Sequence, residues 1–518
     1  MILDSQTEII KALSQPETYG KKTKQVDIRQ SHIAMLFLTE DKAYKLKRAV
    51  LYPEADFSTQ EKRRLACVRE MKRSTVYAPG LITGVKPVRR LENGQIVIGG
   101  KNGTEIDTVL EMRRIPAENL LNNLLPRPTF DRFEAMDLAE SLADLHKRAK
   151  IFKTKWGTDT VKKIILENES ILSCFCPELF KKEAVNTLTR NTLAMLGQTT
   201  ALIRYRQKTG HVRKCHGDLL LSNIAYHDKR FLFFSPIEYN ETQCCIDTLY
   251  DLADLLMDLE AKGLRRLTNI LFNHYMAYTN DIDGFPLLPL YQSIRAAGRA
   301  AVCAKRSTLL KGSDKKAVIK EARHYFNLAT RFITQFNPIL IACGGLSGSG
   351  KSRVARDLGG MLSPAPGAVI LRDDIVKKQI VGLPPHQTLD DKYNTPAFDE
   401  VVYDVLRQEA RTALGAGSCV IVDALFYNPA EREAIENLAK ELHLPFIGFW
   451  MDAPLAVRTE RVEKRLRNPS DVRSYEELQK QLTIETGDIS WYKIMTDTPR
   501  EQTTKQAFHI LKKKNKGE

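Results

Sequence analysis

The residues best suited to chemistry in this chain form a glycine-rich segment that ends in lysine and serine. It reads Gly345-Leu346-Ser347-Gly348-Ser349-Gly350-Lys351-Ser352 and fits the spacing GxxxxGK[ST]. Backbone N–H groups of such a loop surround nucleotide phosphates, the lysine reaches the β- and γ-phosphates, and the serine hydroxyl ligates Mg²⁺. An apolar run, 338–343, comes directly before it and favours a buried strand that leads into the loop. The pattern therefore predicts a site for ATP or GTP with Mg²⁺.

Acidic residues follow at the ends of two further apolar runs. One run, 368–371, leads into Arg372-Asp373-Asp374, and the other ends at Asp423. The carboxyl ends of parallel strands face the ligand crevice. An acid about 20 residues beyond the lysine suits deprotonation of a hydroxyl acceptor, so Asp373 or Asp374 is the predicted general base. One of the two can instead cap a helix.

Asp423 is predicted to lie near Mg²⁺ or its waters, at the end of a buried strand. The residue after it is Ala424, so this strand lacks the glutamate with which ATPase motors polarise water. This difference favours phosphoryl transfer over hydrolysis.

A basic helix is expected over 458–467, directly before Asn468-Pro469. Arg461 and Arg465 are four residues apart and therefore share a helix face. Such arginines can fold over the phosphates as a lid, stabilise the transferring group and exclude water. Alternatively, the helix is a solvated one in which Glu460 and Glu463 pair with the basic residues.

A second group of candidate residues lies in the first half of the chain, within Cys215–Asn223. The segment fits H-x-D-x-x-x-x-N. In a catalytic loop of this kind the aspartate, here Asp218, accepts a proton from the substrate hydroxyl, and the asparagine, here Asn223, holds Mg²⁺. An apolar run that reads as a strand then ends in an acid, Glu238.

This first half resembles the aminoglycoside/choline phosphotransferase-like branch of the protein-kinase fold, in its HGD…N loop, its acid-bearing strand and its Tyr-Asp-Leu-Ala helix start. The resemblance implies Asp218 as general base and Asn223 as a metal ligand. It further implies the following roles: Glu238 as a metal ligand, Lys45 or Lys47 as the lysine on the α/β-phosphates, Glu70 as its partner, and Asp251 as a brace of the catalytic loop.

Two departures from that pattern concern nucleotide and metal binding. No glycine-rich loop precedes Lys45, and Ser235 stands where relatives carry aspartate in the pattern F-D-x-I-E-[FY]. A Mg²⁺ site that loses a carboxylate loses charge and affinity. The first half is therefore expected to be either a kinase with weakened nucleotide binding or a pseudokinase.

The second half resembles the zeta-toxin, polynucleotide-kinase and gluconate-kinase group of P-loop kinases, through its P-loop and its Arg372-Asp373-Asp374 segment. The resemblance implies Asp373 or Asp374 as the acceptor-activating base and Lys377 as a substrate contact. The pairing of the two halves is similar to the bacterial family described as bifunctional aminoglycoside phosphotransferase/ATP-binding proteins.

The elements that must position these residues predict two domains. Residues 1–335 are expected to form an α+β protein-kinase-like domain, with short strands and one charged helix over 20–115 and amphipathic helices from 128 onward. Asn337-Pro338 is the expected hinge. Alternating strands and helices then predict an α/β P-loop NTPase domain with a parallel sheet over 336–518.

Charge and cysteine content indicate which ligands the protein binds and in which compartment it occurs. The net charge of +15 favours acidic ligands such as nucleotides and phosphorylated metabolites, and it allows nucleic acid without favouring it. Nine cysteines without a C-x-x-C pair suggest reduced thiols. With no signal-peptide or membrane-spanning pattern, a cytoplasmic protein without membrane contact is expected.

Three functional hypotheses remain open at this point. The first is ATP- and Mg²⁺-dependent phosphoryl transfer to a small-molecule hydroxyl, with the C-terminal site better preserved. The second is a nucleic-acid 5′-end kinase, favoured by the basic charge. The third is a non-catalytic, nucleotide-gated regulatory protein whose N-terminal half is a pseudokinase.

Overall fold

The computed structural model describes residues 6–515, except 22, 32, 53–54, 126, 128–129, 467–480 and 482–483. The chain divides into two compact units, and each is assembled from three stretches. The first comprises 1–130, 144–161 and 203–255, and the second comprises 131–143, 162–202 and 256–518. Helices between 256 and 335 thus form one compact unit with the P-loop region. The predicted boundary at 335 marks where the sequence changes from one expected fold type to the other, and it stays a prediction.

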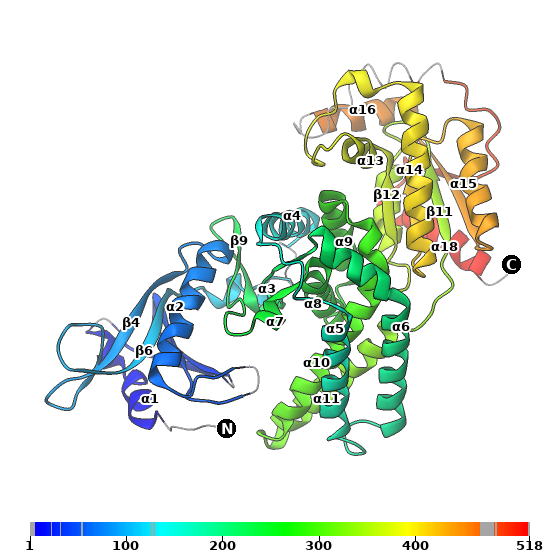
Figure 1. Ribbon diagram of the computed structural model, residues 1–518. Coiled ribbons are helices and arrows are strands. Elements are labelled where there is room, and N and C mark those ends of the chain that lie inside the picture. Colours follow the sequence, from blue (N-terminus) through cyan, green and yellow to red (C-terminus); the bar gives the residue numbers. More distant parts are fainter. Residues whose placement is uncertain are drawn as a thin grey trace. The chain divides into compact units, whose positions relative to one another are not determined.

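A six-stranded antiparallel sheet begins the first unit, with strand order β1-β2-β3-β6-β4-β5. Helix α2, Gln60–Tyr77, lies across it (Figure 1). Residues 91–95, which include Asn93-Gly94, form the turn between β4 and β5. The strands are β1 Asp27–Gln30, β2 Ala34–Leu38, β3 Lys42–Lys47, β4 Ile82–Arg90, β5 Ile96–Ile98 and β6 Thr104–Arg113.

The rest of this unit holds short strands and helices around the predicted catalytic loop. Two small antiparallel sheets pair β7 with β10 and β8 with β9. The elements are α1 Thr7–Leu13, α3 Leu121–Leu124, β7 Val212–Lys214, β8 Ile224–His227, β9 Arg230–Phe233, α7 Glu241–Cys244 and β10 Cys245–Asp247. Four of the described helices have residues in both units: α4 Arg132–Arg148, α5 Thr158–Ser173, α6 Lys182–Thr209 and α8 Thr248–Ala261.

The second unit contains a five-stranded parallel sheet with strand order β12-β13-β11-β14-β15. The strands are β11 Leu340–Gly344, β12 Val369–Arg372, β13 Val420–Asp423, β14 Phe446–Asp452 and β15 Tyr492–Met495. The four residues of β13 are all buried, as a strand covered on both faces should be. This arrangement confirms the predicted α/β fold with a parallel sheet.

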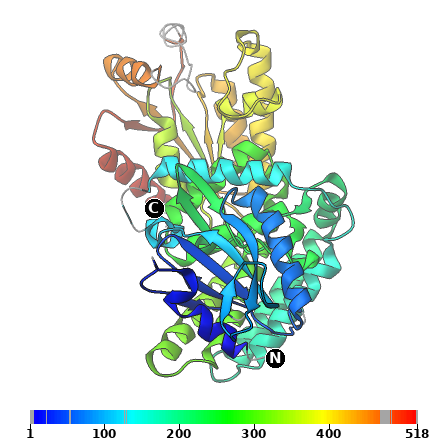
Figure 2. The same cartoon turned by 90° about the vertical axis from the view of Figure 1, so that its left-hand side faces the viewer.

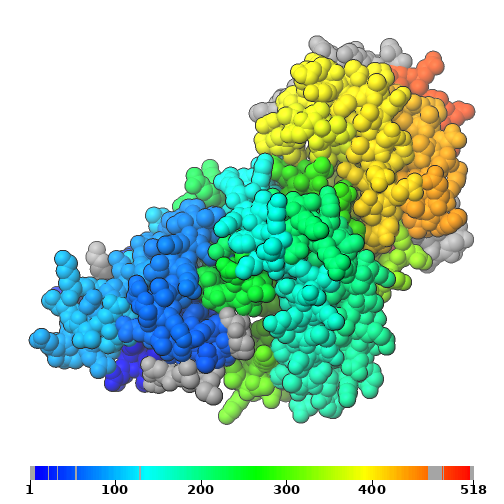
Figure 3. Space-filling view, in the orientation of Figure 1, coloured from blue at the N-terminus to red at the C-terminus, as the bar shows by residue number. Residues whose placement is uncertain are grey.

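Helices cover both faces of that sheet, as Figures 1 and 2 show. On one face, residues of α12 and α18 join the core formed by the strands. On the other, α14 packs against β12 and β13, and it contributes to the yellow surface in Figure 3. The helices of this region are α12 Lys351–Gly359, α13 Asp373–Ile380, α14 Pro396–Gly415, α15 Pro429–Glu441, α16 Leu455–Leu466 and α18 Arg500–Asn515.

Helices α9 Arg265–Thr279, α10 Leu288–Ser307 and α11 Gly312–Phe332 precede the sheet in the second unit. Short 3₁₀ segments occur at Pro16–Tyr19, Ala117–Asn119, Leu221–Asn223, Ile282–Leu287 and Asp391–Tyr393. None of the described helices combines the length and the apolar character that a membrane span requires.

Helix α9 packs directly on the P-loop region through a polar contact. Asn269 Nδ2 donates to the carbonyls of Pro366 (3.2 Å) and Ala368 (2.9 Å), and the N–H of Ile370 donates to Asn273 Oδ1 (2.7 Å). The backbone at Gly367 can lie this close to α9 because glycine has no side chain. A Cβ on Gly367 would lie 2.6 Å from Asn269 Nδ2. The amides therefore fix α9 to the amino end of strand β12.

Replacing Gly367 by alanine will lower the free energy of unfolding of the second unit by about 3 kcal/mol. Gly367 has φ +104°, which costs an L-residue about 1–2 kcal/mol, and the new Cβ would also meet the Gly359 carbonyl oxygen at 2.4 Å. Gly382→Ala is the matched control, because Gly382 has φ +75° and a Cβ added there would meet no atom within 4 Å. Urea unfolding, monitored by tryptophan fluorescence, measures the free energy of unfolding of both variants. Equal losses of stability in Gly367→Ala and Gly382→Ala would contradict the close contact with α9.

Candidate functional site

The P-loop lies between β11 and α12, as the sequence predicts. Strand β11 ends at Gly344, and α12 begins at Lys351. Glycine is required at position 348, because a Cβ there would lie 2.6 Å from the carbonyl oxygen of Arg458. The loop therefore lies against α16, and the start of α12 directs its N–H groups toward the position that phosphates take in such loops.

Lys351, Ser352 and Asp423 form the centre of this site. Lys351 is buried, and its Nζ lies 3.4 Å from the carbonyl oxygen of Leu346. The Ser352 hydroxyl interacts with the carboxylate of Asp423 at the end of β13 and lowers the pKa of that carboxyl. Burial raises the pKa of Asp423, and the charges of Arg372 and Lys351 partly oppose that shift. A hydroxyl beside a carboxylate is the oxygen donor set that Mg²⁺ accepts.

The two neighbouring aspartates after β12 have different partners. Both oxygens of Asp374 accept hydrogen bonds from the Arg372 guanidinium, at 3.0 and 2.6 Å. Asp373 is buried, and its Oδ1 accepts a hydrogen bond from the N–H of Asp374 (2.7 Å) at the start of α13. Asp374 is therefore held by a fixed ion pair, whereas the charge of Asp373 acts on nearby Asp423.

Two arginines of α16 contact the P-loop. Arg461 Nη1 donates to the carbonyl of Gly348 (3.2 Å), and its Nη2 donates to the carbonyl of Thr496 (2.5 Å). Arg458 Nε donates to the carbonyl of Ser347 (2.9 Å). Both arginines thus reach the loop and brace its backbone. The Arg465 side chain and residues 467–480, where the predicted lid continues, lie outside the described residues.

Gln481 is a site residue that the sequence analysis missed. Its Oε1 accepts the N–H of Ser347 (2.7 Å), and its Nε2 donates to the Ser347 hydroxyl (2.9 Å). Arg458 begins the basic helix whose arginines were predicted to form the lid, although Arg461 and Arg465 were the two singled out. Gln481 carries no comparable signal, because its contact with the loop depends on the tertiary fold. Lys377, predicted as a substrate contact, pairs with Asp399 at 2.5 Å.

A cavity of about 550 Å³ adjoins the P-loop within the second unit. Five of the residues predicted for the C-terminal site line it together: Lys351, Ser352, Asp373, Asp374 and Asp423. Its volume falls in the range of about 300–1,000 Å³ that is usual for ligand pockets.

Glu409 of α14 also lines this cavity, and burial together with the charge of Asp283 raises its pKa to about 7. A raised pKa in the folded state means that the stabilising contribution is present at pH 4 and is lost as the pH rises through 7. Glu409→Gln is therefore expected to stabilise the protein by about 1–3 kcal/mol at pH 8 and to change little at pH 4.5. Thermal unfolding of wild type and Glu409→Gln at pH 4.5 and pH 8 measures the stabilisation. An equal gain in stability at both pH values would contradict the raised pKa of Glu409.

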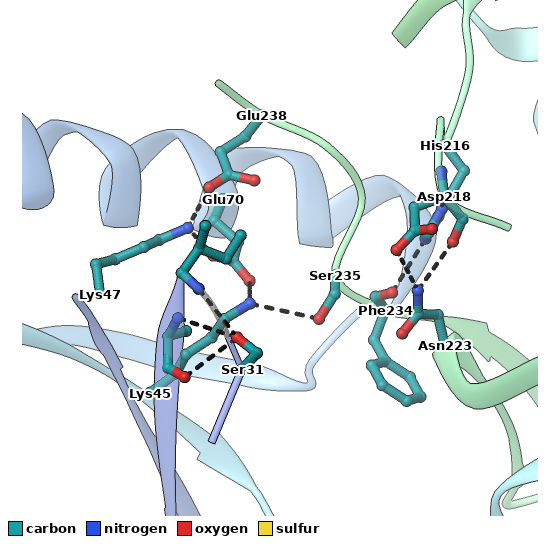
Figure 4. A network of polar contacts seen from close by, with 12 residues as sticks. Ser31, Lys45, Lys47, Glu70, His216, Asp218, Asn223, Phe234, Ser235 and Glu238 are labelled. Carbon is teal, nitrogen blue, oxygen red and sulfur yellow. Dashed lines mark hydrogen bonds and ion pairs between the residues drawn. The ribbon is translucent and has the colours of Figure 1, made fainter. Parts of the chain in front are cut away.

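In the first unit, the residues predicted from the kinase resemblance lie in two groups (Figure 4). Lys45 Nζ donates to Glu70 Oε1 (2.6 Å) and lies 3.4 Å from the Ser235 hydroxyl. Asn223 Nδ2 donates to the Asp218 carboxylate and to its carbonyl, both at 2.9 Å. The strand β3 and helix α2 supply the first group, and the catalytic loop supplies the second.

Asp251 braces the catalytic loop in the way the resemblance implied. Its Oδ2 accepts the N–H of His216 (3.0 Å), and its Oδ1 accepts the N–H of Gly217 (2.8 Å). His216 Nε2 in turn donates to the carbonyl of Phe234 (3.0 Å), which ties the loop to the segment that carries Ser235.

Glu238 does not lie with the group that was expected to hold a metal. Its carboxylate pairs with Lys47 Nζ, and Lys47 also pairs with Glu70 Oε2 (2.7 Å). Figure 4 shows this cluster on the far side of Ser235 from Asn223. The placement argues against Glu238 as a metal ligand, because a buried lysine already neutralises it. It also separates the roles of the two lysines, since Lys45 is the one that faces Ser235.

The charges in that cluster are strongly coupled. Burial opposes the charge on Lys47, but Glu238 and Glu70 outweigh it and raise the pKa of Lys47. Burial raises the pKa of Glu238, and the charge of Lys47 opposes the rise. Glu70 is also buried, yet Lys45 and Lys47 lower its pKa to about 2. A fixed ammonium thus stands between two carboxylates next to the predicted nucleotide site.

Comparison with known proteins agrees with this division of the chain. Residues 340–483 match a family model described as an AAA domain. The matched residues include strands β11 to β14 of the parallel sheet and the P-loop. In the first unit, the antiparallel sheet, the Lys45–Glu70 pair and the Asp218–Asn223 loop agree with the protein-kinase-like fold that the sequence predicts.

A relative found by sequence spans nearly the whole chain. An uncharacterized protein of Mycobacterium tuberculosis (strain H37Rv) is 26% identical over 498 residues, which cover 94% of this chain and 95% of that protein.

The solved structures each cover one part of the chain. A choline/ethanolamine kinase family protein from Mesorhizobium loti covers 62% of this chain and 94% of its own, with 12% identity and TM-score 0.38. A sugar kinase from Janibacter sp. HTCC2649 covers 34% and 95%, with 20% identity and TM-score 0.24.

Proposed function

We propose that this protein is an ATP-dependent kinase that transfers a phosphoryl group to the hydroxyl of a small-molecule acceptor at its C-terminal P-loop site. The observation that carries the proposal is the cavity that Lys351, Ser352, Asp373 and Asp423 line together. A phosphate-binding loop, a metal-ligand pair and an acid for the acceptor are the parts that phosphoryl transfer requires.

Each residue then has a defined role. Lys351 binds the transferring phosphoryl group and offsets the charge that develops on it. Asp373 accepts the proton of the acceptor hydroxyl, because both oxygens of its neighbour Asp374 are engaged by Arg372. Arg461 and Arg458 hold the loop carbonyls, which keeps the loop N–H groups directed at the phosphates.

Mg²⁺ fits the pair formed by Ser352 and Asp423. Both groups carry oxygen ligands, both line the same cavity, and Asp423 is buried with a raised pKa. A cation bound between them would offset the cost of burying the carboxylate charge. When bound, Mg²⁺ supplies charge neutralisation on the phosphates.

A non-catalytic role for the N-terminal site is the second candidate, favoured by one observation. Ser235 faces Lys45 in place of an aspartate, and Glu238 is neutralised by Lys47. Asn223 is then the one predicted metal ligand left at that site among the described residues. Such a site supports nucleotide binding through Lys45 better than it supports metal-dependent transfer.

The test is ATP consumption by the full chain with pooled metabolites, nucleosides and short 5′-hydroxyl oligonucleotides. Wild type is compared with Lys351→Ala and Asp218→Ala. We expect product from wild type and Asp218→Ala but none from Lys351→Ala. Loss of product in Asp218→Ala alone would move the catalytic site to the N-terminal unit. Turnover of oligonucleotides that falls steeply with salt would instead favour the end-kinase alternative.

A further inference from the structure

Part of the cavity wall comes from helices outside the AAA-domain match. Helix α4 contributes Arg132, and α9 contributes His274 and Tyr278. The amides of Asn269 and Asn273 attach α9 to strand β12, which ends directly before Asp373. Because α9 is fixed to the strand that leads to the predicted base, its side chains in the cavity are positioned to select the acceptor.

Two arginines line this space without forming an ion pair to a described carboxylate. Arg356 of α12 and Arg132 of α4 line the cavity, and neither makes a hydrogen bond or ion pair with any residue that the structure describes. Burial, then Arg372, then Arg132 lower the pKa of Arg356 to about 10, and the charges of Asp423 and Asp357 oppose that shift. A partly buried guanidinium with five donors is costly to leave unpaired. The two guanidiniums therefore offer charged donors to an anionic group in this cavity.

Carboxylates line other parts of the same cavity. Asp137 and Glu140 lie on α4, and Glu409 lies on α14. Burial raises the pKa of Asp137, and Glu140 and Asp131 add to the shift. Carboxylates accept hydrogen bonds from hydroxyl groups. An acceptor that suits this lining therefore combines one anionic group with several hydroxyls.

We propose that the acceptor is a polyhydroxylated anion, a sugar phosphate or sugar acid, whose anionic group binds between Arg132 and Arg356 while a hydroxyl faces Asp373. The proposal rests on the proposed function of the P-loop site and adds the substrate class and two specificity residues. In the transfer step the acceptor oxygen bonds to the γ-phosphorus, the bond to the β-phosphate oxygen breaks, ADP leaves, and Asp373 takes the hydroxyl proton.

The test measures binding separately from turnover. The full chain is first saturated with AMP-PNP and Mg²⁺, and calorimetry then follows four matched pairs: glucose and glucose 6-phosphate, glucose and gluconate, ribose and ribose 5-phosphate, glycerol and glycerol 3-phosphate. We expect at least one anionic member to bind 10-fold or more tightly than its neutral partner. Arg132→Gln and Arg356→Gln should each weaken that binding by about 10–100-fold, as expected for a charged hydrogen bond.

The controls separate the acceptor proposal from the proposed function. Arg356→Lys keeps the charge and should retain part of the affinity, and Arg411→Gln, on the surface beside Glu441, should behave as wild type. Failure of AMP-PNP to bind would contradict the proposed function itself. Intact AMP-PNP binding with no anion preference in any pair, or with both arginine variants unchanged, overturns the acceptor proposal alone. A loss of AMP-PNP affinity in Arg356→Gln would assign that arginine to the nucleotide and also overturn it.

Discussion

Replacing Asp373 by asparagine will lower kcat of the phosphoryl transfer by about 10²–10⁴-fold, the range that a general base contributes. Asparagine keeps the shape and can still accept the N–H of Asp374 through its carbonyl oxygen, a contact of 2.7 Å in the wild type. It cannot take a proton from the acceptor. The affinity for ATP should therefore change by no more than about twofold. Single-turnover kinetics with the acceptor found in the pooled assay measure the chemical step, and a fluorescent ATP analogue measures binding.

Asp374→Asn is the matched control for that experiment, because it removes the same charge one residue away. Its two oxygens are held by Arg372, so they have no role in proton transfer. We expect a loss of less than about 10-fold, through the altered position of Arg372 near Asp423 (3.9 Å). A larger loss in Asp374→Asn than in Asp373→Asn would reverse the assignment of the base.

The P-loop site could be predicted from the sequence because its parts are local. Eight consecutive residues specify the loop, and the strands that end at Arg372 and Asp423 are apolar runs whose carboxyl ends must meet at one edge of a parallel sheet. The choice between Asp373 and Asp374 could not be made in this way. It depends on the direction in which each side chain leaves the start of α13, and therefore on the Arg372 contact.

Contacts between segments that are distant in the sequence produced the features that could not be predicted. Glu238 and Lys47 lie 191 residues apart, and their pairing depends on how β3 and the segment after β9 pack. Likewise, the contact of α9 with the P-loop region depends on amides that read as ordinary polar residues of an amphipathic helix. Arg132 and Arg356 each belong to a helix with a common charge pattern, and only the fold brings both to one cavity.

Replacing Lys47 by methionine will lower the free energy of unfolding of the first unit by about 3–5 kcal/mol. The side chain of Lys47 is 1% exposed and that of Glu238 is 4% exposed, so the substitution leaves a buried carboxylate without its partner. Lys45→Met is the matched control on the same strand. Lys45 is 12% exposed, and its loss leaves Glu70 paired with Lys47, so the expected cost is about 1–2 kcal/mol.

Two further measurements test the cause of that loss. Glu238→Gln added to Lys47→Met removes the unpaired charge and should recover about half of the lost stability. The Lys47→Met protein should also be less destabilised at pH 4.5 than at pH 8. Without Lys47, burial leaves the pKa of Glu238 raised in the folded state, so the stabilising contribution present at low pH is lost as the pH rises.

Hydrogen exchange of peptides from β3 and α2, measured by mass spectrometry, reports the stability of the first unit alone. Equal losses in the two lysine variants, with no effect of pH, would mean that the cluster does not carry the charge pairing that Figure 4 shows.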